Sequence, residues 1–119
     1  MRNLQLRSKS FAVNVIRFCR TLPKTPEARV IRDQLLRSAT SVGANYRAAC
    51  HAHTKKAFIH KLSIVEEEAD ESQFWLEVLT DLQLGQASKR DELQQEAREL
   101  TSIIVASKKT ARSRPGKRV

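Results

Sequence analysis

Five carboxylates within residues 66–71 form the densest group of potentially reactive side chains in this 119-residue sequence. Paired carboxylates in a helical bundle can hold two iron ions, but those sites also need Glu-x-x-His motifs on two helices. No glutamate in the sequence has a histidine three positions later. We therefore predict no di-iron site, and the carboxylates remain either a solvated surface or part of an interface.

The other side chains with reactive chemistry do not combine into a recognisable site. Cys50 and His53 could share one face of a helix, but two ligands leave a zinc site incomplete. No serine lies in the glycine-flanked elbow that activates a nucleophile. Gly43 and Gly85 are isolated, so no phosphate-binding loop is present. The sequence predicts a protein that is not an enzyme and that uses no metal or cofactor.

Basic side chains are more informative, because charge is segregated along the chain. The formal net charge is +9. Residues 1–24 carry +6, residues 25–60 carry +4, residues 61–107 carry −7 and residues 108–119 carry +6. Segregation of this kind favours an anionic partner, or pairing between oppositely charged subunits.

Eleven basic side chains are candidates for contacts with nucleic-acid phosphates. They are Arg17, Arg20, Lys24, Arg29, Arg47, Lys108, Lys109, Arg112, Arg114, Lys117 and Arg118. Phe11, Phe18, Phe58 and Tyr46 are expected in the core rather than stacked on bases, so binding would be electrostatic and weakly sequence-specific. The alternative is that these charges serve solubility and that the basic tail binds nothing.

Four apolar series with helical spacing predict the elements that position these residues. Steps of three and four residues place each series on one face of a helix. The series are Phe11, Val15, Phe18, Leu22; Ile31, Leu35, Ala39, Val42, Tyr46, Ala49; Phe58, Leu62, Val65, Ala69, Ser72, Leu76, Leu79; and Leu93, Ala97, Leu100, Ile104, Ser107. We predict an all-α fold: an antiparallel up-down four-helix bundle over residues 1–109, with a disordered basic tail over residues 110–119.

Local signals mark the ends of these helices. Pro23 ends the first helix, and Thr25 followed by Pro26 and Glu27 is typical of the start of the second. Gly85 is predicted as the residue that closes the third helix. Ser88, with Asp91 three positions later, has the form of a capping box and predicts the start of the fourth.

The third helix carries a second stripe beside its core stripe. This stripe comprises Ile64, Glu68, Glu71, Trp75, Val78 and Leu82. A monomeric bundle needs one apolar stripe per helix, so a second stripe with the only tryptophan favours a subunit interface. We predict this interface at Glu68, Glu71, Trp75, Val78 and Arg37. The candidate cationic partners of the two carboxylates are Arg32, Arg37 and Arg47. The alternative is a wide core face with an exposed tryptophan and a solvated acidic run.

Several locations are disfavoured by composition. The longest stretch without Lys, Arg, Asp or Glu is nine residues, whereas a membrane-spanning helix needs about 20 apolar residues. No secretory signal follows the basic residues at the N-terminus. Two cysteines are too few for a disulfide scaffold, so we expect reduced thiols, a cytoplasmic location and no membrane association.

Two segments resemble the signatures of a known family. Residues 36–46 read Leu-Arg-Ser-Ala-Thr-Ser-Val-Gly-Ala-Asn-Tyr. Residues 58–62 read Phe-Ile-His-Lys-Leu, and Glu67, Glu68, Ala69, Glu71 and Phe74-Trp75-Leu76 follow. These segments resemble the bacterial four helix bundle protein family. It includes proteins encoded in intervening sequences of ribosomal-RNA genes, and it is related to the accessory variability determinant proteins of diversity-generating retroelements.

The resemblance covers about residues 8–107 and implies more than the fold. It implies a homopentamer, association with RNA or DNA, and contact with a reverse transcriptase or another nucleoprotein. Arg37, Asn45, Glu68 and Glu71 match signature positions and are expected to be structural. The leading hypothesis is therefore an oligomeric bundle that binds nucleic acid through a basic face and tail. The rival hypothesis is a protein-interaction scaffold whose charge segregation serves assembly alone.

Overall fold

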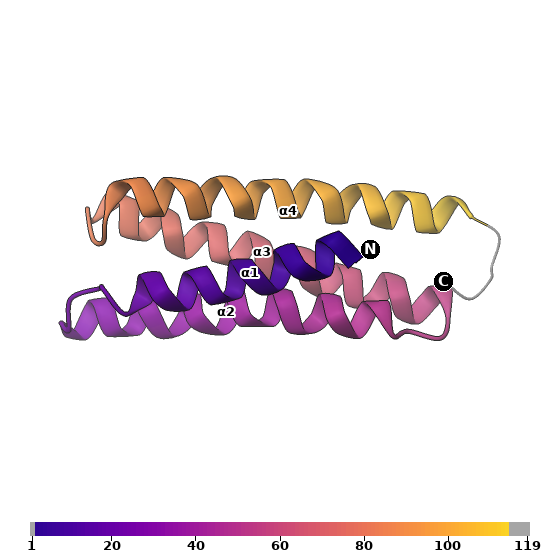
Figure 1. The fold of residues 1–119 in the computed structure, drawn as a ribbon, viewed down its shortest axis with the longest axis horizontal. Helices are drawn as coiled ribbons and strands as arrows, with labels where there is room; N and C mark the ends of the chain where they lie inside the picture. Colours follow the sequence, from indigo (N-terminus) through magenta and orange to yellow (C-terminus); the bar gives the residue numbers. More distant parts are fainter. Residues whose placement is uncertain (1, 115–119) are drawn as a thin grey trace.

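Four helices joined by short loops make up the computed structural model, which describes residues 2–114 (Figure 1). They are α1 (Arg2–Cys19), α2 (Pro26–Cys50), α3 (Lys55–Asp81) and α4 (Ala87–Ser113). Successive helices run in opposite directions along a body of 50 × 20 × 18 Å. The predicted antiparallel four-helix bundle is confirmed.

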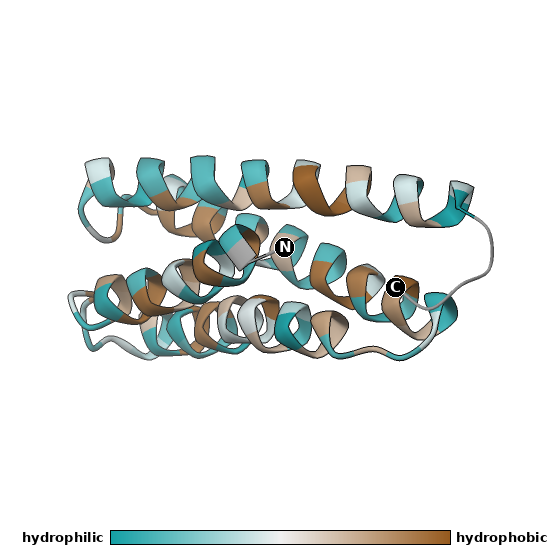
Figure 2. Ribbon diagram, turned by 45° about the vertical axis from the view of Figure 1, so that its right-hand side comes forward, coloured by the Kyte–Doolittle hydropathy of each residue, from teal (hydrophilic) through white to brown (hydrophobic). Residues whose placement is uncertain are grey.

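The core is built from the predicted stripes. In α3 all seven residues of the predicted core series are buried, and in α2 all six are. Polar positions face outwards, and the first turns of α4 are predominantly hydrophilic in Figure 2. A polar contact deep between α2 and α3 joins Ser38 and Ser72, whose hydroxyl oxygens lie 2.9 Å apart. Small side chains at these two positions let the helices approach closely.

The helix starts confirm one sequence signal and correct another. Thr25 caps α2, where its side-chain oxygen accepts a hydrogen bond from the Ala28 amide at 3.3 Å. At α4 the predicted cap at Ser88 is wrong, because the helix begins at Ala87 with Gln86 as its N-cap and no side-chain cap. The residue at which α4 starts is set instead by the tight turn between α3 and α4.

That turn is a Schellman motif with an unusual residue at its left-handed position. The Leu84 amide donates to the Leu79 carbonyl at 2.9 Å, and the Gln83 amide donates to the Thr80 carbonyl at 3.0 Å. Gln83, with φ of 55°, holds the left-handed position that was predicted for Gly85. Gly85 follows two residues later with φ of 79°, and a Cβ there would lie 2.5 Å from Cζ of Phe18.

A buried arginine holds the same turn from α4. Arg90 is 7% exposed, and its Nη1 donates to the carbonyl oxygens of Leu84 and Gly85 at 2.7 and 2.8 Å. Gln94, one turn later, is also buried and donates to a Glu77 carboxylate oxygen at 3.3 Å. Both residues lie beside the predicted apolar stripe, so a search for apolar periodicity passes over them.

The C-terminal boundary lies later than predicted. The bundle was expected to end at residue 109, but α4 continues to Ser113. Ala111 packs into the core and is 4% exposed. The Lys55 ammonium on α3 donates to the carbonyls of Arg112 and Arg114 at 3.2 and 2.6 Å, which satisfies acceptors at the helix end. Of the predicted tail, residues 115–119 lie outside the described part.

Candidate nucleic-acid interface

The basic residues predicted to contact phosphates form two groups at opposite ends of the bundle. Arg17, Arg20, Lys24 and Arg29 lie where α1 ends and α2 begins. The other group is Arg47, Lys108, Lys109, Arg112 and Arg114, near the ends of α2 and α4. Arg29 and Arg47 project in similar directions, but 18 residues of one helix separate them by about 27 Å. Lys117 and Arg118 lie outside the described residues.

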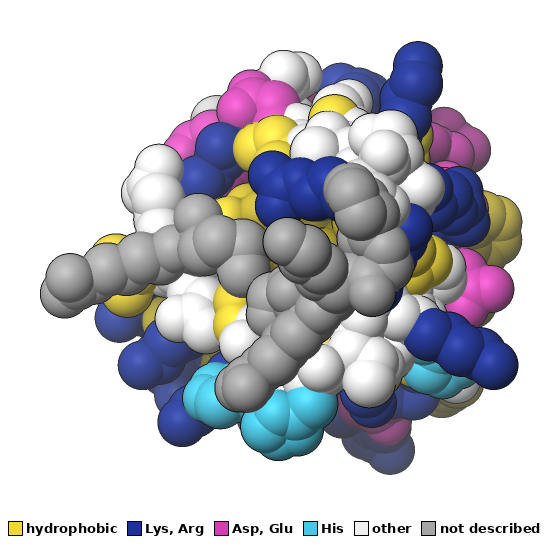
Figure 3. Space-filling view, turned by 90° about the vertical axis from the view of Figure 1, so that its right-hand side faces the viewer, with side chains coloured by type: hydrophobic (Ala, Val, Ile, Leu, Met, Phe, Trp, Pro, Cys, Tyr) yellow, Lys and Arg dark blue, Asp and Glu magenta, His cyan; other side chains and the backbone are white. Residues whose placement is uncertain are grey.

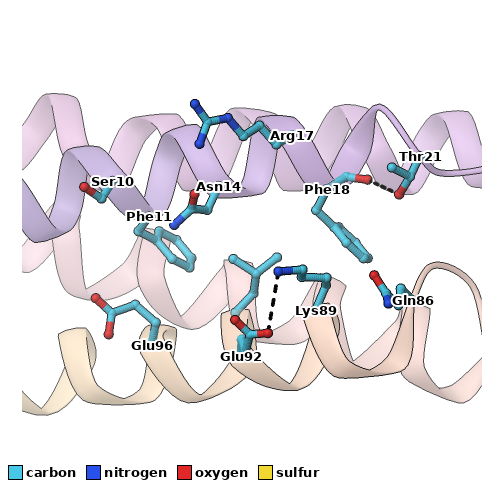
Figure 4. Close-up of a pocket in the computed structure, with 11 residues that line it drawn as sticks. Ser10, Phe11, Asn14, Arg17, Phe18, Thr21, Gln86, Lys89, Glu92 and Glu96 are labelled. Atoms are coloured by element: carbon cyan, nitrogen blue, oxygen red, sulfur yellow. Dashed lines mark hydrogen bonds and ion pairs between the residues drawn. The ribbon is translucent and has the colours of Figure 1, made fainter.

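The first group has carboxylates beside it. Arg17 lines a cleft of about 510 Å³ between α1 and α4, together with Lys89, Glu92 and Glu96 (Figure 4). The rings of Phe11 and Phe18 point from α1 towards α4 in this view. Lys89 Nζ lies 3.8 Å from a Glu92 carboxylate oxygen. The mixed charge makes this end a poor surface for a polyanion.

The second end carries nearly all of the net charge. Residues 42–65 and 100–114 hold eight Lys and Arg and no carboxylate. The rest of the described chain, residues 2–41 and 66–99, holds twelve Lys and Arg against thirteen carboxylates, so its formal charge is −1. We call the surface formed by residues 47–61 and 108–114 the basic end. In Figure 3, which faces this end, Lys, Arg and His side chains surround it and carboxylates appear only towards the periphery.

Two of the eight basic side chains have structural tasks. Lys108 Nζ lies 2.9 Å from a Glu66 carboxylate oxygen and its side chain is 14% exposed, so its charge is neutralised on α3. Lys55 holds the C-terminal end of α4 through the two carbonyl contacts already described. The exposed cations left at this end include Lys56, which sequence inspection did not single out. The others are Arg47, Lys109, Arg112 and Arg114, whereas Lys61 is partly buried.

The predicted interface carboxylates are paired within the chain. Arg37 Nη1 lies 3.0 Å from a Glu68 carboxylate oxygen, and Nη2 also bonds Glu71. Trp75 Nε1 donates to the same Glu71 carboxylate at 3.2 Å. The hydrogen bond from Arg37 lowers the pKa of Glu71, and the same contacts raise the pKa of Arg37. Neither carboxylate therefore needs a cation from a second subunit.

The apolar part of that surface is incompletely covered. Trp75 and Val78 are partly buried against the core, and Leu82, the last residue of the stripe, is 51% exposed. Phe74 is 52% exposed, and its ring meets Trp75 edge-on with centroids 4.8 Å apart. Val30, on the preceding helix, is 60% exposed. A contiguous exposed apolar patch is typical of a surface that another molecule covers, whereas single exposed apolar side chains are common on any protein.

The described residues contain neither a candidate metal site nor a candidate membrane-spanning helix. Within residues 2–114 no three His, Cys, Asp or Glu side chains are grouped so that they could hold a metal ion. None of the four helices described is both long and apolar enough to cross a bilayer. Cys19 is buried, and burial raises the pKa of its thiol to about 12, so it is a poor nucleophile at neutral pH.

Comparisons with known proteins agree with the fold. A solved structure from Bacteroides thetaiotaomicron, described as a protein of unknown function from the S23 ribosomal protein family, is 30% identical in sequence and superposes with a TM-score of 0.83. The match covers 89% of this chain and 98% of that one. No curated protein matches the sequence. The family model for the 23S rRNA-intervening sequence protein matches residues 3–106. With the signatures on α2 and α3 in place, the chain belongs to the 23S rRNA-intervening sequence protein family.

Proposed function

We propose that this protein is a non-enzymatic bundle that binds nucleic acid through the basic end. The observation that carries the proposal is the concentration of charge: eight Lys and Arg with no carboxylate in residues 42–65 and 100–114, against a formal charge of −1 on the rest of the described chain. A phosphate backbone is a favourable partner for such a surface, because binding releases its counterions.

The chemistry of the basic end favours backbone contacts over base recognition. Phe58 within it and the adjacent Tyr46 are 7% and 2% exposed, so they offer no platform for stacking. The N-terminus of α3 meets the C-termini of α2 and α4 at this end, so the positive field comes from the Lys and Arg side chains and not from the helix dipoles. We infer weak dependence on base sequence and strong dependence on salt.

Binding to short RNA and duplex DNA, followed by fluorescence anisotropy over a salt series, tests the proposal. The basic-end variant combines Lys56→Gln, Lys109→Gln and Arg112→Gln. The matched control combines Arg17→Gln, Arg20→Gln and Lys24→Gln, which removes the same charge from the opposite end. We expect the basic-end variant to bind more weakly, with a salt slope shallower by about 0.9 for each duplex phosphate that it no longer neutralises. The affinity and the salt slope of the control variant should change far less.

Equal losses in the two variants would contradict the proposal, because net charge rather than the basic end would then determine binding. No binding of the unaltered protein at low salt would also contradict it. The scaffold hypothesis would then be preferred.

Self-association is a second candidate property, favoured by the exposed apolar groups beside the Arg37 ion pairs. We propose that Val30, Phe74 and Leu82, which are 60%, 52% and 51% exposed, are covered by another copy of the chain. The resemblance described above implies five copies. The expected interface now comprises Trp75, Val78 and these exposed residues, while Glu68, Glu71 and Arg37 act within one chain.

A further inference from the structure

A hollow between α3 and α4 borders the basic end. It has a volume of about 320 Å³, and its lining comprises Glu66 from α3 and Val105, Lys108, Lys109 and Arg112 from α4. Steps of three and four residues place these α4 side chains on one face of the helix. Of the described residues that line the hollow, three are cations and one is a carboxylate.

The three cations are held in different ways. Lys109 and Arg112 are exposed. Lys108 Nζ lies 2.9 Å from a Glu66 carboxylate oxygen, and 14% of the Lys108 side chain is exposed. In the other ion pairs among the described residues, the side chain of the cation is between 32% and 60% exposed. Lys108 is therefore held against α3, because a partly buried charge is costly to separate from its partner.

Lys109 and Arg112 together provide donors for a single phosphate group. They lie three residues apart, so they are neighbours on the surface of α4. An ammonium group and a guanidinium group both donate charge-assisted hydrogen bonds to phosphate oxygens, and the guanidinium can donate two at once. Lys108 would be a third cationic donor if Glu66 did not bind it.

We propose that this hollow holds one backbone phosphate of a bound nucleic acid between Lys109 and Arg112, and that Glu66 limits the affinity by withholding Lys108. The inference rests on the nucleic-acid binding proposed above and names the residue that sets its strength. Glu66 acts in two ways, since its carboxylate neutralises the third cation and also repels the phosphate. Both effects weaken binding by the unaltered protein.

Glu66→Gln tests the inference, because it keeps the size of the side chain and removes its charge. Binding of the full chain to duplex DNA is followed by fluorescence anisotropy over the same salt series. We expect the affinity to rise by about threefold or more, and the salt slope to become steeper by about 0.9 because Lys108 then neutralises one further phosphate. Glu66→Ala provides a second variant if Glu66→Gln does not fold.

The matched controls are Glu67→Gln and Asp70→Asn, which remove the same charge from exposed positions of α3. Neither residue lines the hollow. Their affinity should therefore rise less than that of Glu66→Gln, and their salt slope should stay the same. Adding Lys108→Gln to Glu66→Gln should remove most of the gain in affinity and in slope, since the released cation is then absent.

Three results would overturn the inference. An equal gain in Glu67→Gln or Asp70→Asn would show that net charge alone determines the affinity. A gain that survives the addition of Lys108→Gln would show that Glu66 does not act through Lys108. If neither the unaltered protein nor Glu66→Gln binds at low salt, the inference fails together with the proposed function, whereas the first two results would leave that function standing.

Discussion

At the scale of single residues, charge pairing within the chain replaces the pairing between subunits that the sequence suggested. Arg37 bridges Glu68 and Glu71, and Arg7 bridges Glu96 and Glu99. The Arg37 network joins α2 to α3, and the Arg7 network joins α1 to α4. Such networks fix how neighbouring helices are placed, while each exposed pair contributes little stability.

The Arg37 network predicts a pH dependence of stability. The hydrogen bond from Arg37 lowers the pKa of Glu71, so the folded state favours the carboxylate. This contribution is fully present above the unfolded pKa of about 4.3 and is lost as pH falls through the lower folded value. Arg37→Gln should reduce stability at pH 7 by at most about 1 kcal/mol, with the difference shrinking below about pH 4.

Thermal unfolding followed by circular dichroism between neutral and acidic pH measures this difference. Arg32→Gln is the control, because Arg32 pairs only with its exposed neighbour Asp33. A difference between Arg37→Gln and the unaltered protein that does not change with pH would contradict the role given to Glu71.

The turn between α3 and α4 predicts two substitutions of opposite sign. Gln83→Gly should stabilise the protein by about 0.5–1 kcal/mol, because φ of 55° is unfavourable for a residue with a side chain. Gly85→Ala should destabilise it by about 1–3 kcal/mol, because the new Cβ would lie 2.5 Å from Phe18 at a positive φ. Urea unfolding measures both.

Ser88→Ala is the control for this turn and should be nearly neutral, because Gln86 and not Ser88 is the N-cap of α4. A loss of about 1 kcal/mol on Ser88→Ala would restore the predicted capping box.

At the scale of elements, apolar spacing predicted which face of each helix is buried. The prediction succeeded because a helix turns once every 3.6 residues, so residues three and four apart lie on the same face. The α3 series from Phe58 to Leu79 is buried throughout. The spacing could not reveal Arg90, since its burial depends on carbonyls in a turn that only the folded chain brings near. Nor could it reveal the contact of Lys55 with the carbonyls at the end of α4, because periodicity gives the direction around a helix and not the partners in space.

The contact of Lys55 with the end of α4 predicts a local change in dynamics. Lys55→Ala removes the donor to the Arg112 and Arg114 carbonyls, so the last turn of α4 should open more readily. Hydrogen exchange should show faster exchange at residues 111–114 and little change in the centre of α4. Lys56→Ala, at the neighbouring exposed position, should leave these amides unchanged; equal effects of the two variants would contradict the assignment.

At the scale of the whole molecule, the exposed apolar groups near Trp75 predict self-association. Val30→Asp combined with Leu82→Asp should lower the mass in solution to that of a single chain, because two new charges would lie in the covered surface. Both residues are more than half exposed in one chain, so folding should survive. Sedimentation velocity measures the mass, with Leu6→Asp, at a residue 60% exposed on α1, as the control.

An unchanged assembly in the double variant, or a mass of one chain for the unaltered protein, would contradict this prediction. Glu71→Arg would be a less informative variant, since it would also break the Arg37 network within the chain.

The concentration of formal charge at one end of a 50 Å body gives the molecule a permanent electric dipole along its long axis. In the field of a polyanion this dipole would turn the protein end-on before contact, with the basic end leading. The orientation search that slows most macromolecular encounters would be shortened. This pre-orientation would raise the association rate and leave the lifetime of the complex unchanged. The increase in rate would become smaller as added salt screens the field.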